Sequence, residues 1–449
     1  MSSSEWSRSA SLQCWIAREG TERGRSAVWR DVDDDLAGGG RPVVENFAWI
    51  LSGRVVYAAG QWVMLAGLAK LTNPSTVGQF ALGVAVAAPA FQLGNLQLRG
   101  VQATDAQDEY TFGEYLGLRL VTTPVALLFI GAIALVGYAP ATGAVILLVG
   151  LSKAAESLSD VHHGLMQKHE RLDPIGQSLI VKSVVSTAAF LGLLAATGSL
   201  VWALWGLVAS WSLVLVWFDI PRARSIAAGV GPAQSMGPSW SPGRLTALAR
   251  LALPLGITMM LISLMTNVPR YVIEADLGEG PLGIFAALSY VVVAGTTVVY
   301  ALGEAATPRL ARLFVDPSEG SFGGLVIRML VVGAIAGGAG IFIAHLWGRE
   351  LLSLLYTDEY GSYEALFVWI MAAGAASYCA SIFGFAMTAA RRFRVQVPLF
   401  ALVLAVTTAG CWILVPSYGL VGAAWALTAA GLVQMVGSGG VVWWALRNR

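Results

Sequence analysis

Five polar residues recur at helical spacing through one long apolar segment, predicted as a helix over residues 142–166, and the turn after it. They are Lys153, Glu156, Asp160, His163 and Gln167, at successive spacings of three, four, three and four residues. At about 100° per residue, all five fall within roughly 80° of arc. Charge inside so apolar a segment is costly and usually functional, so we predict that this stripe faces protein or water rather than lipid.

The stripe has two interpretations. In the structural one, Lys153 pairs with Glu156 three residues further on, and Asp160 or His163 caps the inner end of the helix. In the functional one, the stripe lines a cleft and handles a substrate or a coupling ion. We favour the functional interpretation, because a scaffold helix would be more stable without buried charge.

Three arginines near the first apolar segments are further candidates. Arg54 lies about two turns inside the first predicted span. It either reaches back to the headgroup layer or points into the cleft, where a guanidinium suits a phosphate through two hydrogen bonds. Arg99 and Arg119 lie at predicted cytoplasmic helix ends, where anchoring by basic residues is one interpretation and phosphate binding the other. The second half has fewer buried charges, so we expect the ion or headgroup site in the first half.

The composition predicts what surrounds these groups. Of the 449 residues, 56% are hydrophobic and 12% are charged, and the mean hydropathy is +0.67. A soluble domain carries about 25% charged residues, so much of this surface faces lipid. A membrane helix needs about 20 apolar residues, which predicts twelve spans, over residues 46–70, 76–98, 117–138, 142–166, 175–196, 200–219, 247–268, 281–305, 323–347, 363–388, 396–415 and 419–446. The spans lack the alternation of a β-barrel, so we predict an all-α polytopic membrane protein.

The predicted spans form two lobes. Residues 221–246 form a proline-rich cytoplasmic linker between six-helix lobes over residues 46–220 and 247–449. Short stretches of the two lobes resemble each other, such as LVWALWGLVA (200–209) and LVGAAWALTA (420–429). Such repeats predict pseudo-symmetric bundles around a central cleft. Residues 1–45 are predicted to be a disordered tail, and the distribution of basic residues places both termini in the cytoplasm.

The sequence offers no signature of an enzyme, a metal site or a nucleic-acid-binding protein. Cys14, Cys379 and Cys411 are scattered, and the four histidines form no ligand set. A phosphate-binding loop is missing, and the net charge of +1 creates no field that would attract nucleic acid. We therefore expect no catalytic residues, no metal, no cofactor and no nucleic-acid partner.

Several segments together resemble a known family. KAAESLSDVHHGLMQKHERLDPIGQSL (153–179) is similar to the fourth-helix signature of the bacterial polysaccharide-biosynthesis (O-antigen) flippases. LQLRGVQATDAQDEYTFGEYLGLR (96–119), NVPRYVIEADLGEGPLGIFAALSYVV (267–292) and GRELLSLLYTDEY (348–360) resemble other parts of the same family. The resemblance extends over about residues 45–446, and the family belongs to the multidrug/oligosaccharidyl-lipid/polysaccharide (MOP) superfamily.

The resemblance implies two lobes, alternating access and no cofactor. It also implies that basic residues in the cavity meet the phosphates of the substrate. Arg54 and Lys153 fit that role here, with Arg99 and Arg119 as further candidates. We expect a transporter that moves a lipid-linked oligosaccharide, the precursor of a polysaccharide, O-antigen or capsule, from the inner to the outer leaflet of a bacterial inner membrane. Its partners would be this cargo, the membrane lipids, and H⁺ or Na⁺ bound at Glu156 or Asp160 as the coupling ion.

Three alternatives stay open, and one of them, a structural membrane scaffold, is disfavoured by the charged stripe. A multidrug/cation antiporter of the same superfamily should have an acidic cavity without lysine, and Lys153 argues against it. A membrane enzyme such as a sugar-lipid ligase would need a large outer loop, and the predicted outer loops are short.

Overall fold

The computed structural model describes residues 43–105, 107–230, 236–315, 318, 320–390 and 393–447. The predicted tail therefore lies outside the described residues, except for its last three positions. All regular secondary structure in the described part is helical, which confirms the predicted all-α class.

The first half of the chain contains eight α-helices and one π-helical turn. They are α2 (Val43–Leu71), α3 (Pro74–Asn95), α4 (Leu98–Thr104), α5 (Phe112–Gly137), α6 (Pro140–Lys168), α7 (Asp173–Thr197), α8 (Leu200–Val214), the π-helix η1 (Leu215–Asp219) and α9 (Ile220–Val230). The second half contains α10 (Pro242–Leu277), α11 (Glu279–Val315), α12 (Phe322–Leu355), α13 (Asp358–Gly361), α14 (Glu364–Ala389) and α15 (Phe393–Arg447). The first ten residues of the stretch predicted as a linker, 221–230, are thus helical in α9, and its last five, 242–246, begin α10.

Local sequence signals set several of the helix ends. Asn73 caps α3 by accepting a hydrogen bond from the Thr76 amide at 3.0 Å, and Pro74 follows at the first turn. Thr111 and Glu114 form a capping box at the start of α5. These caps satisfy backbone donors that no residue within the helix can reach.

Helix α15 folds back on itself. It has 55 residues, so a straight helix would be about 80 Å long, far more than the roughly 30 Å core of a bilayer. Gly419 has φ 60° and ψ −140°, which breaks the helix three residues after Pro416. Its two parts pack side by side, and an added Cβ on Gly410 would lie 3.1 Å from the Ala426 Cβ.

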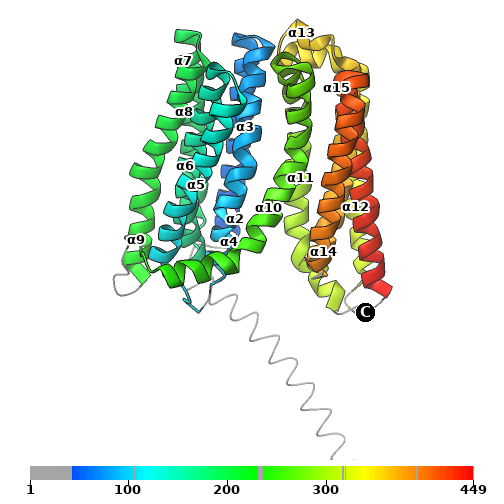
Figure 1. Ribbon diagram of the computed structural model, residues 1–449. Coiled ribbons are helices and arrows are strands. Elements are labelled where there is room, and N and C mark those ends of the chain that lie inside the picture. Colours follow the sequence, from blue (N-terminus) through cyan, green and yellow to red (C-terminus); the bar gives the residue numbers. More distant parts are fainter. Residues whose placement is uncertain are drawn as a thin grey trace, which may run out of the picture.

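Ten helices in the described residues are long and apolar enough to cross a membrane. This number counts α15 once and leaves out α2, so the predicted count of twelve spans stays a prediction. Figure 1 shows α2 to α9 on one side of the molecule and α11 to α15 on the other, with α10 running between them. We call the end that holds Val43 and Arg447 the terminal end, and the opposite end, which holds Leu71 and Tyr360, the distal end.

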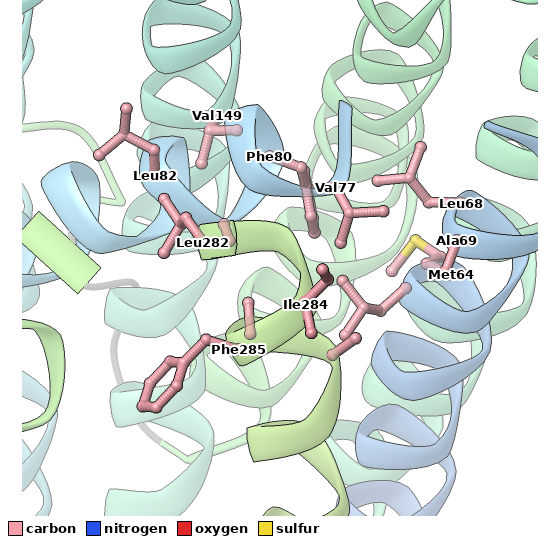
Figure 2. Close-up of a cluster of buried hydrophobic side chains, with 14 of the residues drawn as sticks. Met64, Leu68, Ala69, Val77, Phe80, Leu82, Val149, Leu282, Ile284 and Phe285 are labelled. Carbon is pink, nitrogen blue, oxygen red and sulfur yellow. The ribbon is translucent and has the colours of Figure 1, made fainter. Parts of the chain in front are cut away.

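The two halves pack together toward the distal end. Figure 2 shows Leu282, Ile284 and Phe285 of α11 among buried side chains of α2, α3 and α6. The backbones of α3 and α11 touch: a Cβ added to Gly283 would lie 1.9 Å from the Pro74 carbonyl oxygen. Only glycine allows so close an approach.

Polar contacts reinforce this closure. The Glu279 carboxylate, at the first turn of α11, accepts hydrogen bonds from Ser75 and Gln79 of α3, each at 3.0 Å, and from Thr142 of α6. Lys70 of α2 donates to the Leu354 carbonyl at 2.8 Å. The distal end is therefore closed by backbone packing and by hydrogen bonds between the halves.

Candidate functional site

The first charged cluster lies on α6 and faces α2 and α8. The Lys153 ammonium is 2.7 Å from the Glu156 carboxylate, and Tyr57 donates to the other Glu156 oxygen at 3.0 Å. The ammonium also lies 5.3 Å from the centre of the buried Trp211 ring. Glu156 keeps 35% of its side chain exposed, so this pair is reached from one side by solvent or by a ligand.

The second cluster joins α6 to α4 and α5. Arg119 is fully buried, and its guanidinium lies 3.1 Å from the Asp160 carboxylate. Arg119 also donates to Asn95 and, at 3.3 Å, to Ser157. Arg99 is 3.7 Å from the same Asp160 carboxylate, so one acidic group is held by two guanidiniums.

A third cluster, formed by Asp219, His163 and Lys182, was not proposed as a site from the sequence. The buried Asp219 accepts a hydrogen bond from Ser178 at 2.6 Å, lies 3.2 Å from His163 and is 3.7 Å from the Lys182 ammonium. It ends the π-helix η1, and π-helical turns inside helices are frequent at functional sites. Among the described residues, no group of histidine, cysteine or acidic side chains could hold a metal ion.

Arg54 lies apart from these clusters and reaches across to the other half. Its Nη1 lies 2.9 and 3.0 Å from the two carboxylate oxygens of Glu304 on α11. Both side chains are about half exposed, at 53% and 51%. This pair therefore bridges the halves nearer the terminal end, in contact with solvent.

An apolar cavity lies along the same two helices as this pair. It has a volume of about 440 Å³ and is lined by α2, α11 and the end of α12. Ala58, about one turn after Arg54 on α2, and Trp62 line one wall, while Tyr290, Val293 and Val298 line the other. The cavity thus lies between the two halves and has an apolar lining, to which neither Arg54 nor Glu304 belongs.

A second cavity lies inside the second half. It has a volume of about 320 Å³, and α10, α11, α14 and α15 line it. Arg270 and several hydroxyl and amide side chains form its polar lining. Val293 of α11 lines both cavities, so this one helix separates an apolar compartment from a polar one.

The terminal end carries ion pairs of its own. Arg244, at the start of α10, lies 2.6 Å from Glu114 of α5. This ion pair joins the two halves in addition to the chain segment that connects them. In the loop after α4, burial alone would raise the pKa of Asp105. Hydrogen bonds from the Glu109 and Tyr110 amides, together with the nearby Lys168 ammonium, outweigh this and lower the pKa.

The predicted site residues thus fall into three separate groups. Lys153 and Glu156 form one pair, Arg99 and Arg119 meet Asp160 in another cluster, and Arg54 pairs with the opposite half. The Lys153–Glu156 pair is the one that the structural interpretation of the stripe describes. The partners Glu304 and Asp219 were not proposed, because no spacing along the chain connects them to Arg54 or His163.

Comparison with known proteins identifies the fold. No family model matches the chain. Over 401 residues, it is 26% identical to the capsular polysaccharide biosynthesis protein CapF of Staphylococcus aureus, an alignment that covers 88% of this chain and 98% of CapF. The lipid II flippase MurJ in an inward closed conformation has a TM-score of 0.68 at 10% identity, covering 89% of this chain and 87% of MurJ.

A multidrug resistance MATE family transporter of the MOP superfamily, in an inward-facing conformation, has a TM-score of 0.67 at 11% identity. That match covers 88% of this chain and 94% of the transporter. This chain has the fold of these transporters. The resemblance found in the sequence is confirmed, because the curated relative is a polysaccharide biosynthesis protein and the solved structures are a flippase and a transporter. Ten helices in the described part of the chain are able to span a bilayer, so it is a multi-pass membrane protein.

Proposed function

We propose that this protein translocates a lipid-linked oligosaccharide, a precursor of a cell-surface polysaccharide, from the inner to the outer leaflet of a bacterial inner membrane. One observation carries the proposal: a half-exposed guanidinium, Arg54, lies on α2 about one turn before Ala58, which lines an apolar cavity between the two halves. An amphiphilic anion needs both surfaces at once. The polysaccharide relative CapF supports the same substrate class.

Arg54 is the group that would bind the phosphates of the cargo. A guanidinium offers several donors in a planar fork that matches a phosphate. Glu304 now occupies that position, with both of its oxygens within 3.0 Å of the same nitrogen. A phosphate would replace the carboxylate on Arg54, and this exchange would release the contact between the halves.

The apolar cavity is the place for the lipid chain. Its walls are aliphatic and aromatic side chains of α2 and α11, and Val55 and Val298 are 49% and 62% exposed. A hydrocarbon chain there would stay in an apolar environment while its headgroup moves through the protein. Moving the headgroup through hydrocarbon alone would cost several kcal/mol for each charge.

Lys153 and Glu156 would serve the second requirement, coupling to an ion gradient. Glu156 has one ammonium and one phenol as partners and stays partly exposed. Asp160 is held by two guanidiniums, so of the two acids proposed for H⁺ or Na⁺, Glu156 is the better placed. When Glu156 takes up its ion, Lys153 would be free to contact an anionic cargo. Arg99 would be an additional phosphate ligand.

The cycle follows from which contacts are strong. The distal end is closed by packed backbones, whereas at the terminal end the Arg54–Glu304 pair is half exposed. The basic residues place the terminal end in the cytoplasm. Cargo would therefore enter from the inner leaflet, and rocking of the halves would present it to the outer leaflet.

Deletion of the gene tests this proposal. We expect lipid-linked oligosaccharide to accumulate on the inner leaflet of the deletion strain. In a separate assay, vesicles that contain the purified protein should translocate lipid-linked oligosaccharide, and vesicles without it should not. The antiporter alternative draws on the MATE likeness and predicts a different outcome. In that case, deletion would raise sensitivity to cationic drugs and leave the distribution of lipid-linked oligosaccharide unchanged.

A further inference from the structure

The polar cavity inside the second half contains a cation, Arg270, that has no counter-ion among the described residues. Arg270 donates one hydrogen bond, from Nη1 to the Asn267 oxygen at 3.0 Å. Within the described residues, no carboxylate lies within 4.0 Å of its guanidinium, whereas Arg54, Arg99 and Arg119 each have one. A guanidinium has five N–H donors, so most of those of Arg270 stay available to a ligand.

The rest of the cavity lining offers hydrogen bonds to a polyhydroxylated molecule. Ser377, Ser381 and Gln434 line it, and their side chains make no hydrogen bond with any described residue. The hydroxyls of Ser289 and Thr296 donate back to their own helix, at 2.7 and 3.0 Å, but their oxygens still accept. Serine, threonine and glutamine can each donate and accept, as sugar hydroxyls do.

The position of the cavity relates it to the cargo. Helix α11 has the apolar cavity on one side and this polar cavity on the other, with Val293 on both. The phosphates of a lipid-linked oligosaccharide join its lipid chain to its first sugar. With the chain in the apolar cavity and the phosphates on Arg54, the sugars are the part of the cargo that the polar cavity can receive.

We propose that the polar cavity is a glycan subsite that selects an acidic sugar, with the sugar carboxylate on Arg270 and its hydroxyls on the serine, threonine and glutamine side chains. This inference rests on the proposed function, because it assigns the sugar part of the same cargo. The single guanidinium matches one carboxylate through paired hydrogen bonds. The volume of about 320 Å³ lies at the small end of ligand pockets, which fits one or two sugar units rather than a long chain.

Binding of soluble sugars to the purified full-length protein tests the subsite. The probes are digalacturonic acid, the neutral disaccharide maltose and inorganic phosphate, each measured by calorimetry. We expect digalacturonic acid to bind at least tenfold more tightly than maltose, and Arg270→Gln to reduce that preference to near unity. Arg270→Lys should keep part of the preference, and Arg349→Gln, an exposed arginine outside the cavity, should keep all of it.

Folding of the variant is checked in the same samples. Because Arg270 has no carboxylate partner in the described residues, Arg270→Gln should leave the Tm unchanged or raise it. Equal binding of the acidic and neutral sugars would overturn the inference. So would a preference that survives Arg270→Gln, or phosphate that competes as well as the acidic sugar.

The subsite and the proposed function fail in different ways. If Arg270-dependent sugar binding is present but vesicles translocate no lipid-linked oligosaccharide, the proposed function is wrong and the subsite stands. If translocation proceeds without any Arg270-dependent preference, the subsite is wrong and the proposed function stands.

Discussion

Substitutions at Arg54 and Glu304 should change cargo binding in opposite directions. In the proposed function, Glu304 competes with the phosphate for Arg54. Glu304→Gln removes the competitor and frees the guanidinium, whereas Arg54→Gln removes the phosphate ligand itself. If the pair only held the fold together, both variants would bind the cargo equally, either as tightly as the wild type or more weakly by the same factor.

The magnitudes follow from exposure and charge. The Arg54 and Glu304 side chains are 53% and 51% exposed, so the ion pair contributes about 0–1 kcal/mol. Freeing Arg54 should therefore raise cargo affinity by up to about fivefold, since 1.4 kcal/mol corresponds to tenfold. Loss of charged hydrogen bonds in Arg54→Gln costs about 1.5–3 kcal/mol, which is a decrease in affinity of roughly 10- to 150-fold.

The assay is equilibrium binding of a fluorescent polyprenyl-pyrophosphate probe to the purified protein, at low and high salt. Arg309→Gln, an exposed arginine on the same helix beyond Glu304, is the matched control and should bind like the wild type. The gain in Glu304→Gln should shrink at high salt, because salt screens exposed charges. The reasoning is refuted if Glu304→Gln binds the probe more weakly than the wild type, or if Arg54→Gln binds it equally well.

Two further predictions concern the ends of the molecule. Gly283→Val should open the distal contact and slow translocation, because its Cβ would lie 1.9 Å from the Pro74 carbonyl oxygen. Gly280→Val is the control and should be tolerated, because no atom lies within 4 Å of an added Cβ there. A cysteine placed at Ser75 measures the opening, which should make its thiol react faster with a labelling reagent. Asp105 has a lowered pKa, so its contribution to stability is complete above its unfolded pKa of about 3.9 and is lost as pH falls through the lower folded pKa. Asp105→Asn should lower the Tm at pH 7 and flatten its decline below pH 4; an unchanged profile would contradict this.

The sequence predicted the helices better than it predicted their partners. The polar stripe was found from its spacing, and α6 begins at Pro140 and ends at Lys168, two residues beyond the predicted segment at each end. Spacing describes a single helix, however, and says nothing about what its stripe faces. Asp160 is held from α5 by Arg119, 41 residues away, and Arg54 meets a residue 250 positions further along the chain.

Local departures from the α-helix also hid part of the site. Asp219 was assigned to the last position of a predicted span and was given no role. The π-helical turn from Leu215 to Asp219 shifts the residues after it out of a 3.6-residue period, so periodicity cannot indicate where Asp219 points. Its contact with His163 places the fourth residue of the stripe against α7 and η1 rather than beside Glu156.

From the number of charged residues, we predicted the headgroup site in the first half. The number of cations does not show, however, how many of them are free to bind an anion. The first half holds more charged residues within its predicted spans, but Lys153, Arg99 and Arg119 already have carboxylates beside them. Arg270 lies in the half that has fewer charged residues in its spans, and no carboxylate of the described residues lies beside it. Pairing depends on tertiary packing, so a sequence reports the number of cations but not which of them can still accept an anion.

In the proposed function, the carboxylate beside Arg54 also meets a requirement of transport. Without a competing anion, a phosphate on this guanidinium would be slower to leave. Exchange of one oxyanion for another keeps the number of charged contacts constant, so loading and unloading differ little in free energy. Because Arg54 and Glu304 belong to different halves, the same exchange would remove one of the contacts that join the halves toward the terminal end. In the proposed function, cargo on Arg54 would displace Glu304, and departure of the cargo would let Glu304 return. Binding of the headgroup and movement of the halves are then one event, which ties rocking to the presence of cargo.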